Sequence, residues 1–109
     1  MLSEQEFRGE SDAALDRLNR ALIKAGDEHE FETDFNSGAL TIEFDDPKGR
    51  FVVSPNAPVR QIWLSALSKS FKLQWNAENG QFVLPETGET LTALVARVVS
   101  QHLGAEVEL

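Results

Sequence analysis

The chain has 109 residues, of which 41% are hydrophobic, and a formal net charge of −8. This length fits a single domain spanning residues 1–109. The charge argues against nucleic acid and anionic membrane as partners, since both require a basic surface. The lack of cysteine excludes disulfides, thiolate catalysis and Cys-based zinc or cluster sites. No segment resembles a membrane span or a targeting peptide, so we expect a cytoplasmic protein.

The first segment has the pattern of an amphipathic helix. Ser3 and Glu6 have the spacing of a capping box. Gly26 resembles a C-terminal stop. We therefore expect a helix from residue 4 to residue 25. Its apolar residues recur at helical spacing: Phe7, Ala14, Leu15, Leu18, Leu22 and Ala25.

An acidic window follows, from residue 27 to residue 46, and it contains no Lys or Arg. Apolar residues alternate with the acids, and this period of two predicts a β-hairpin with one apolar face and one carboxylate face. The carboxylates on such a face repel one another and destabilise the folded state, and a bound cation or a basic partner would relieve this repulsion. A solvated face that only keeps the protein soluble is an equally weighted reading. The window holds eight of the 18 acidic residues: Asp27, Glu28, Glu30, Glu32, Asp34, Glu43, Asp45 and Asp46.

The turn between the two runs determines which acids face each other. A two-residue loop at 37–38 places the apolar residues of both runs on one side, whereas a three-residue loop would place acids among them. Burial therefore selects the two-residue loop. In that register Glu32 lies opposite Glu43 and Glu30 opposite Asp45, and like charges in such positions are destabilising.

The remaining pattern predicts further strands and a final helix. Thr87 or Thr90 can cap that helix, which has an apolar stripe and ends at Gly104. We expect an α+β fold, a two-layer α-β sandwich. In it the N- and C-terminal helices pack on one face of an antiparallel sheet of about six strands. The further strands are expected at residues 50–54, 60–65, 71–75 and 81–84.

Trp63 is predicted to lie on the open face of that sheet. Alternation directs Ile62 and Leu64 to the core, which leaves Trp63 on the opposite face beside Gln61 and Ser65. An exposed Trp there is either an anchor for a protein partner or a cover over its neighbours, and the sequence favours neither.

The acidic residues suggest a metal site of a particular kind. Carboxylates are hard donors that suit Mg²⁺, Ca²⁺, Mn²⁺ and iron. No EF-hand is present, since Glu32 stands where a loop beginning at Asp27 would need Gly. Carboxylates that point outward from a strand cannot close a coordination cage, so we expect an open site rich in water. His29 is expected to be a surface residue and His102 to complement the dipole of the last helix, rather than ligands.

Sequence motifs give no support for a hydrolase or a phosphoryl-transfer enzyme, because neither a nucleophile elbow nor a Gly-rich phosphate loop is present. Instead, the chain resembles the frataxin family, including its bacterial iron-binding members, along nearly its whole length. The resemblance rests on Ser37-Gly38-Ala39-Leu40-Thr41-Ile42, Pro58-x-x-Gln61-Ile62-Trp63-Leu64-Ser65, Trp75 and Thr87-Gly88-Glu89-Thr90-Leu91.

This resemblance implies the same sandwich fold and weak surface binding of Fe²⁺ or Fe³⁺. It implies a regulator or iron donor of iron–sulfur cluster assembly that contacts the cysteine desulfurase and scaffold complex. Arg20 and Lys24 stand where the family is often acidic, which shifts the expected iron site toward the first strand. The expected partner-binding residues are Arg60, Gln61 and Trp63. The expected iron ligands are Asp12, Asp16, Asp27, Glu28, Glu30, Glu32, Asp34 and Glu43.

Two alternatives belong to other functional classes. One is a ferroxidase or iron-storage protein, an activity sometimes assigned to the family, although the chain shows no dedicated catalytic centre. The other is an acidic adaptor that docks a basic protein surface and binds metal only incidentally. We expect a monomer, with an iron-dependent oligomer as a further state.

Overall fold

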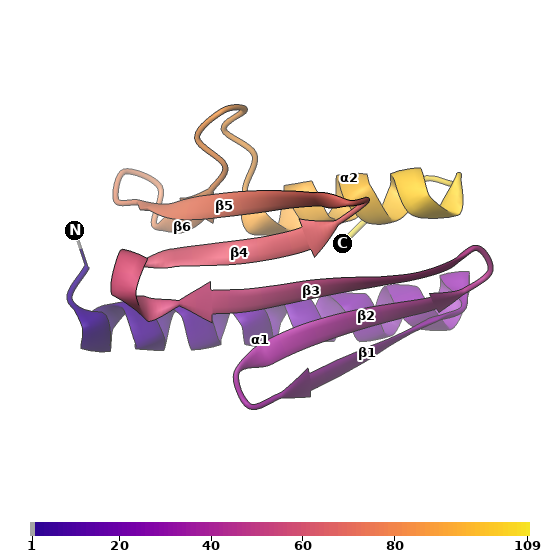
Figure 1. Cartoon of the computed structure of the whole chain (residues 1–109), viewed down its shortest axis with the longest axis horizontal. Helices are drawn as coiled ribbons and strands as arrows, with labels where there is room; N and C mark the ends of the chain where they lie inside the picture. The colour runs from indigo at the N-terminus through magenta and orange to yellow at the C-terminus, as the bar shows by residue number, and fades with distance from the viewer. Residues whose placement is uncertain (1) are drawn as a thin grey trace.

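The computed structural model describes residues 2–109 and confirms the predicted α+β sandwich. Six strands form one antiparallel sheet in sequential order, and a helix precedes and follows them (Figure 1). Among the described residues, neither helix is long and apolar enough to cross a membrane. The elements are α1 (Glu4–His29), β1 (Phe31–Asn36), β2 (Ala39–Asp45), β3 (Lys48–Asn56), the 3₁₀ turn η1 (Ala57–Val59), β4 (Gln61–Ala66), β5 (Lys69–Asn76), β6 (Gln81–Val83) and α2 (Leu91–Leu103).

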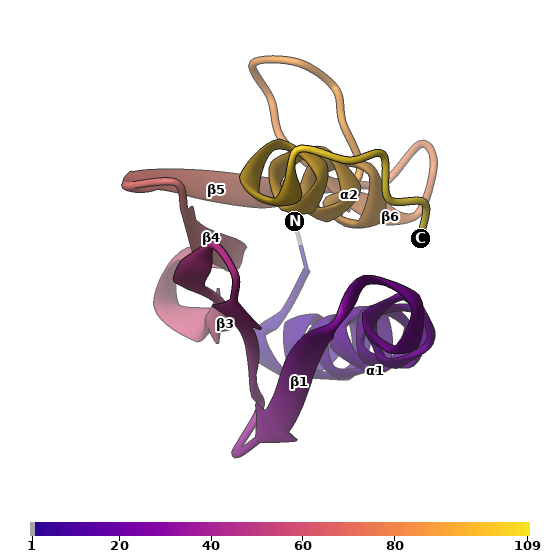
Figure 2. The same ribbon diagram turned by 90° about the vertical axis from the view of Figure 1, so that its right-hand side faces the viewer.

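Both helices cover the same face of the sheet, as predicted (Figure 2). The core between the two layers takes its side chains from alternate strand positions and from one stripe of each helix. Its fully buried members include Leu15 and Leu22 of α1, Ile42 and Val53 of the sheet, and Val98 of α2. The opposite face of the sheet is left open to solvent.

The N-terminal caps predicted for the two helices are present, and so is the predicted glycine at the end of α2. The Glu6 backbone N–H donates to Ser3 Oγ over 3.1 Å, and the Ser3 N–H donates to Glu6 Oε1 over 3.0 Å. The Ser3 backbone N–H, and after it the Ser3 hydroxyl, lower the pKa of the Glu6 carboxyl by hydrogen bonding to its charged form. Thr90 caps α2 by accepting from Ala93, and α2 ends at Gly104 in the left-handed region.

The predicted end of the first helix is wrong. Gly26 lies inside α1, and the helix continues to His29 and is capped by Glu30, whose φ is 59°. A Cβ at Gly26 would lie 2.5 Å from the Phe31 carbonyl oxygen, so this glycine is needed for the close return of the chain rather than for the stop. Asp27 and Glu28 therefore belong to the helix and not to the hairpin.

Strand boundaries also differ from the prediction. The strand predicted at residues 50–54 extends from Lys48 to Asn56 and includes Pro55. Pro55 pairs with β4, but the ladder with β2 ends at Val53, so its missing N–H costs no hydrogen bond on the β2 side. Arg60, predicted to begin the next strand, lies instead in the left-handed region at the end of η1. The strand predicted at 71–75 begins earlier, at Lys69.

His102 makes contacts that the sequence analysis does not predict. It lies in the last turn of α2, and its ring packs at a tilt on Phe44 and edge to face with Phe51, with centroid distances of 4.4 and 5.5 Å. Its Nε2 is 2.7 Å from the Pro47 carbonyl oxygen. The ring thus joins the end of α2 to the β2–β3 turn, and it packs directly on Gly49 near the start of β3.

We expect Gly49→Ala to destabilise the fold by about 1–3 kcal/mol, because the added methyl group would overlap an imidazole ring that is held on several sides. Urea denaturation monitored by circular dichroism measures this change.

Gly9→Ala is the matched control. Gly9 lies in the interior of α1, and a Cβ there meets nothing within 4 Å. This substitution should stabilise the protein by roughly 0.5–1 kcal/mol through helix propensity. If the two variants have equal stability, the contact between His102 and Gly49 is not tight.

Candidate functional site

The register of the acidic hairpin is the predicted one. Phe35 lies opposite Leu40, and Glu32 lies opposite Glu43. Glu32, Asp34 and Glu43 are exposed on the open face, whereas the apolar residues between them face the helices. The predicted pair of Glu30 and Asp45 does not form, because Glu30 caps α1 and the ladder begins at Phe31.

Basic residues of β3 partly neutralise this acidic face. The acidic window at residues 27–46 does not include them. Arg50 lies opposite Glu43 on β3, and its Nε is 3.9 Å from Glu43 Oε1. Lys48 lies opposite Asp45 in the same ladder. Glu32 and Asp34, on the edge strand β1, have no ion-pair partner among residues 2–109. Within the hairpin, the carboxylates that lack a counter-charge on a neighbouring strand therefore lie on β1.

The acids of α1 fall into two separate places. Asp27 and Glu28 are exposed on its last turn and lead directly into Glu30 and β1. Asp12 and Asp16 lie further back, and Asp12 is roughly 22 Å from Asp27 along the helix axis. Asp16 is also paired with Arg20, at 3.0 Å. The eight predicted ligands therefore do not form one site.

The carboxylates that follow one another from the end of α1 into β1 are exposed to solvent. In the part of the chain that the structure describes, no three His, Cys, Asp or Glu side chains are grouped to hold a metal ion. A cation at Asp27, Glu28, Glu30, Glu32 and Asp34 would be held by few protein oxygens, with water supplying the other ligands. An open, water-rich site at these carboxylates stays a prediction.

Trp63 lies on the open face of the sheet, as the alternation of side chains along β4 predicts. Its side chain is 37% exposed, while Ile62 and Leu64 are buried. The indole Nε1–H donates to Gln61 Oε1 over 2.9 Å, and Lys72 Nζ lies 4.9 Å from the ring centre. Beside the ring is a shallow hollow of about 180 Å³, which is lined partly by three serines: Ser54, Ser65 and Ser70. The indole is therefore both accessible and held in one orientation.

Arg60 is placed differently from Gln61 and Trp63. Its guanidinium donates to two main-chain carbonyls, those of Leu2 and Ala57. It thereby ties the N-terminal segment to η1, beside the exposed Val59. Arg60 stays a predicted partner-binding residue, but its hydrogen bonds suit a role in fixing this corner of the molecule.

Comparison with known proteins identifies the family. Residues 1–105 match the family model described as a frataxin-like domain. The chain belongs to the frataxin family. It is 31% identical over 110 residues to the iron-sulfur cluster assembly protein CyaY of Ralstonia nicotianae, an alignment that covers 99% of this chain and 95% of that protein. It is 29% identical to the CyaY protein of Vibrio cholerae over 107 residues, 98% of each chain.

Solved frataxin structures share the fold. The frataxin of Psychromonas ingrahamii superposes with a TM-score of 0.75 at 19% identity, covering 98% of this chain and 97% of its own. Yeast frataxin superposes with a TM-score of 0.72 at 25% identity, covering 92% of this chain and 82% of its own. The frataxin arrangement of two helices on one open sheet is therefore preserved at low sequence identity.

We expect Glu32→Gln to raise the melting temperature at low salt, because it removes a like-charge contact with Glu43. The gain should be a few tenths of a kcal/mol and should fade as salt screens the repulsion. Differential scanning calorimetry at two ionic strengths measures it.

Two variants calibrate that result. Glu43→Gln should gain less than Glu32→Gln, because it also removes the ion pair with Arg50. Glu86→Gln removes the same charge from an exposed loop residue that has no partner across a strand ladder. If Glu32→Gln gains no more than Glu86→Gln, repulsion across the β1–β2 ladder is not the cause.

Proposed function

We propose that this protein binds iron through surface carboxylates and acts as a regulator or iron donor in iron–sulfur cluster assembly, in contact with the cysteine desulfurase and scaffold. The observation that carries the proposal is the similarity, along nearly the whole chain, to proteins named for iron–sulfur cluster assembly. The bacterial relatives also favour a cytoplasmic location, which is part of the proposal.

The uncompensated carboxylates support iron as the ligand. Glu32 and Asp34 on β1 lack cationic partners among residues 2–109, and the exposed acids Asp27, Glu28 and Glu30 precede them along the chain. A bound cation relieves the repulsion between these groups, and carboxylate oxygen is a hard donor suited to iron. Weak, water-rich binding suits a protein that must pass its metal on.

The open sheet face supports a protein partner. Its β1–β2 side is acidic and fits a basic surface, while Trp63 near its centre offers the aromatic contact that often dominates interfaces. Gln61 extends this surface toward Arg60 and the exposed Val59. We therefore assign the desulfurase and scaffold contact to this face and not to the helices.

A metal-independent adaptor is the second candidate function. The pairing of Glu43 with Arg50 favours it, since part of the acidic face already has an internal counter-charge and needs no metal. The two functions differ in one measurable property, which is saturable iron binding in the absence of any partner.

We expect Fe²⁺, added anaerobically, to perturb the backbone amides of residues 27–34 before any others, because the unpaired carboxylates are concentrated there. Titration followed by ¹H–¹⁵N NMR measures this, with a diamagnetic trivalent ion as a surrogate. Binding should weaken strongly as salt is raised from 20 mM to 200 mM, because these groups are exposed and the Debye length falls from roughly 20 Å to roughly 7 Å.

The double variant Glu32→Gln/Asp34→Asn should lose most of this binding, whereas Glu86→Gln should keep it. If the first perturbed amides lie at the 79–80 turn, or if no saturable shift appears, iron binding at β1 is ruled out. The adaptor is then the better description.

We expect Trp63→Ala to separate stability from partner binding. It should cost less stability than Leu64→Ala, a fully buried position where truncation should cost about 2–5 kcal/mol. It should weaken binding to a cysteine desulfurase–scaffold complex by about 2 kcal/mol, or roughly 30-fold. Isothermal calorimetry with the purified complex measures the affinity.

Gln101→Ala, an exposed position on α2, is the control on the opposite layer and should bind as the wild type does. A folded Trp63→Ala variant that binds with unchanged affinity would show that the indole only covers the sheet.

A further inference from the structure

The turn between β5 and β6, residues 77–80, ends in an Asn-Gly pair that the function proposed above does not use. In such a pair the backbone nitrogen of the glycine can attack the side-chain amide of the asparagine, because glycine places no side chain in the way of the close approach. Of the five asparagines in the chain, Asn79 alone precedes a glycine. The other four are Asn19, Asn36, Asn56 and Asn76.

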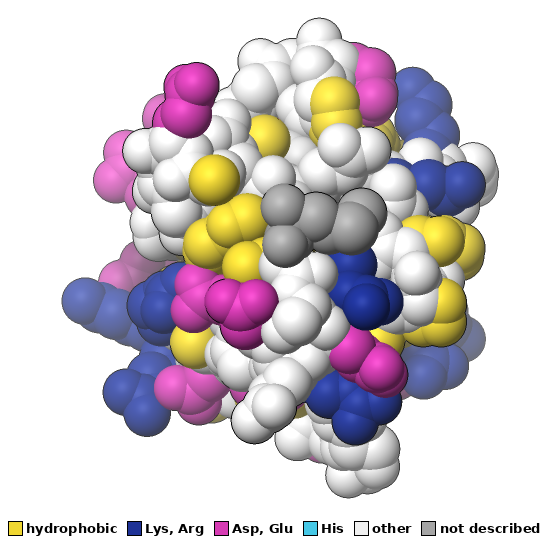
Figure 3. Space-filling model, turned by 90° about the vertical axis from the view of Figure 1, so that its left-hand side faces the viewer, with side chains coloured by type: hydrophobic (Ala, Val, Ile, Leu, Met, Phe, Trp, Pro, Cys, Tyr) yellow, Lys and Arg dark blue, Asp and Glu magenta, His cyan; other side chains and the backbone are white. Residues whose placement is uncertain are grey.

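Solvent and base can reach this pair. Asn79 and Gly80 are exposed, and the ladder between β5 and β6 ends just before them, at Asn76 and Gln81. Figure 1 places the turn at the end of the molecule that Figure 3 views, where acidic, basic and hydrophobic side chains are interspersed. A surface of mixed charge neither repels nor concentrates the hydroxide that would remove the Gly80 amide proton.

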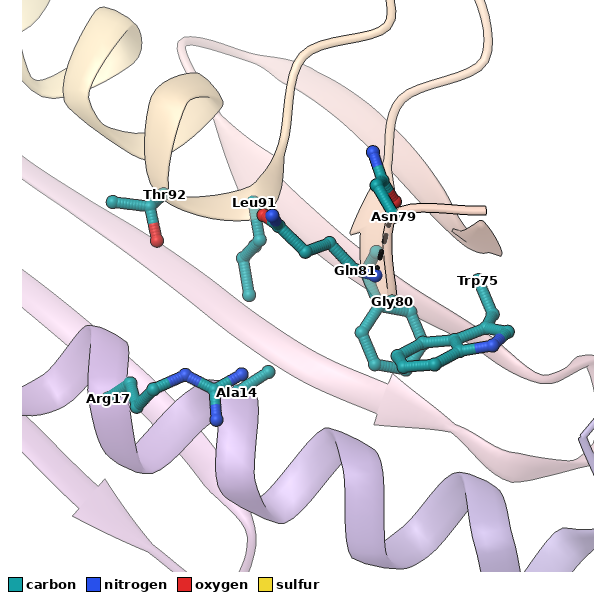
Figure 4. A pocket seen from close by; sticks show the side chains of 9 residues that line it. Ala14, Arg17, Trp75, Asn79, Gly80, Gln81, Leu91 and Thr92 are labelled. Atoms are coloured by element: carbon teal, nitrogen blue, oxygen red, sulfur yellow. Dashed lines mark hydrogen bonds between the residues drawn. The ribbon is translucent and has the colours of Figure 1, made fainter. Parts of the chain in front are cut away.

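A hydrogen bond prepares the Asn79 side chain for attack. Its Oδ1 accepts from the Gln81 N–H over 3.2 Å, the contact drawn as a dashed line in Figure 4. This contact bends the side chain back over the main chain of the two residues that follow, the first of which carries the attacking nitrogen. The donor also stabilises the negative charge that Oδ1 gains when a nucleophile adds to Cγ.

One contact opposes the attack. The Gly80 N–H donates to the Asn76 carbonyl over 2.8 Å, and this hydrogen bond must open before the nitrogen can lose its proton. Asn76 also orders the turn through Oδ1, which accepts from the N–H groups of Glu78 and Asn79. Opening one exposed backbone hydrogen bond slows a reaction by roughly fivefold, so the turn delays the attack without preventing it.

From these contacts we propose that Asn79 is a site of non-enzymatic deamidation. The Gly80 nitrogen loses its proton to hydroxide and forms a bond to Asn79 Cγ. The adduct expels the side-chain nitrogen, which takes up protons and leaves as ammonia, and a five-membered succinimide remains. Water then opens this ring, at Cγ to give aspartate or at the main-chain carbonyl to give isoaspartate. One water is consumed and one ammonia is released, and no oxidant or reductant is needed.

The two products affect the fold differently. Aspartate at position 79 keeps an oxygen that accepts from the Gln81 N–H, and its charge strengthens this hydrogen bond. Isoaspartate carries the main chain through the former side chain and lengthens it by one methylene, which displaces the pairing of Gln81 with Asn76. The first product therefore adds one negative charge to an intact turn, whereas the second loosens the start of β6.

The test incubates the whole chain in mildly alkaline buffer and follows each asparagine by peptide mapping and mass spectrometry. We expect the peptide that contains Asn79 to gain about one dalton before the peptides of the other four asparagines do. In urea, which removes the turn, this gain should be at most about fivefold faster. Asn79→Asp, which reproduces the aspartate product, should keep the melting temperature of the wild type.

Two glycine variants locate the attacking nitrogen. Gly80→Ala should slow the reaction about tenfold, because a methyl group crowds the attack, and a Cβ there meets nothing within 4 Å in the fold. Gly88→Ala is the matched control, since Gly88 also has a positive φ and open space, and it should leave the rate at Asn79 unchanged. Earlier deamidation at another asparagine, equal rates in the two variants, or a folded chain unchanged after the unfolded chain has fully reacted would each overturn the proposal. These variants leave β1 and Trp63 intact, so the outcome is independent of the proposed function.

Discussion

Burial of the apolar side of the β1–β2 hairpin is the constraint on which the surface chemistry depends. Leu40 and Ile42 are completely buried beneath the helices, and a strand has only two sides. Every carboxylate between the apolar positions must therefore face solvent, and Glu32 must face Glu43 across the ladder. A shift of one residue would relieve the repulsion but would bring charges into the core, which costs far more. The fold thus maintains an electrostatic strain at its surface because its interior requires it.

The end of α1 and the end of α2 both pack on this hairpin where β1 begins and β2 ends. The close approach of Gly26 to Phe31 lets the chain turn from helix to strand within one residue, so the acids of the last helical turn continue directly into those of β1. At the end of β2, His102 contacts the Pro47 carbonyl in the β2–β3 turn and the rings of Phe44 in β2 and Phe51 in β3. The acidic residues therefore sit on backbone that is packed at both helix ends, rather than on a free loop.

The local sequence pattern is sufficient to predict features that depend on which side chains are buried. The hairpin register and the exposed position of Trp63 follow from the alternation of apolar and polar residues along the strands. The capping box of Ser3 follows from its spacing to Glu6. The features that sequence reasoning missed are contacts between distant positions. The counter-charge from Arg50 depends on how β3 aligns with β2, and the packing of His102 on Gly49 joins residues far apart in the chain. Gly26 was misread because a glycine needed for close packing has the same local signature as a helix stop.

The hydrogen bond between Trp63 and Gln61 affects both the affinity and the selectivity with which a partner is recognised. An indole that is free to rotate must be ordered by its partner, and that loss of entropy reduces affinity. Here Gln61 and Lys72 hold the ring in one orientation before any encounter. The single donor of the indole is already used, so a partner gains from the ring mainly by dispersion and exclusion of water. Shape complementarity to a fixed ring, rather than polar pairing with it, would then distinguish the right partner from a wrong one.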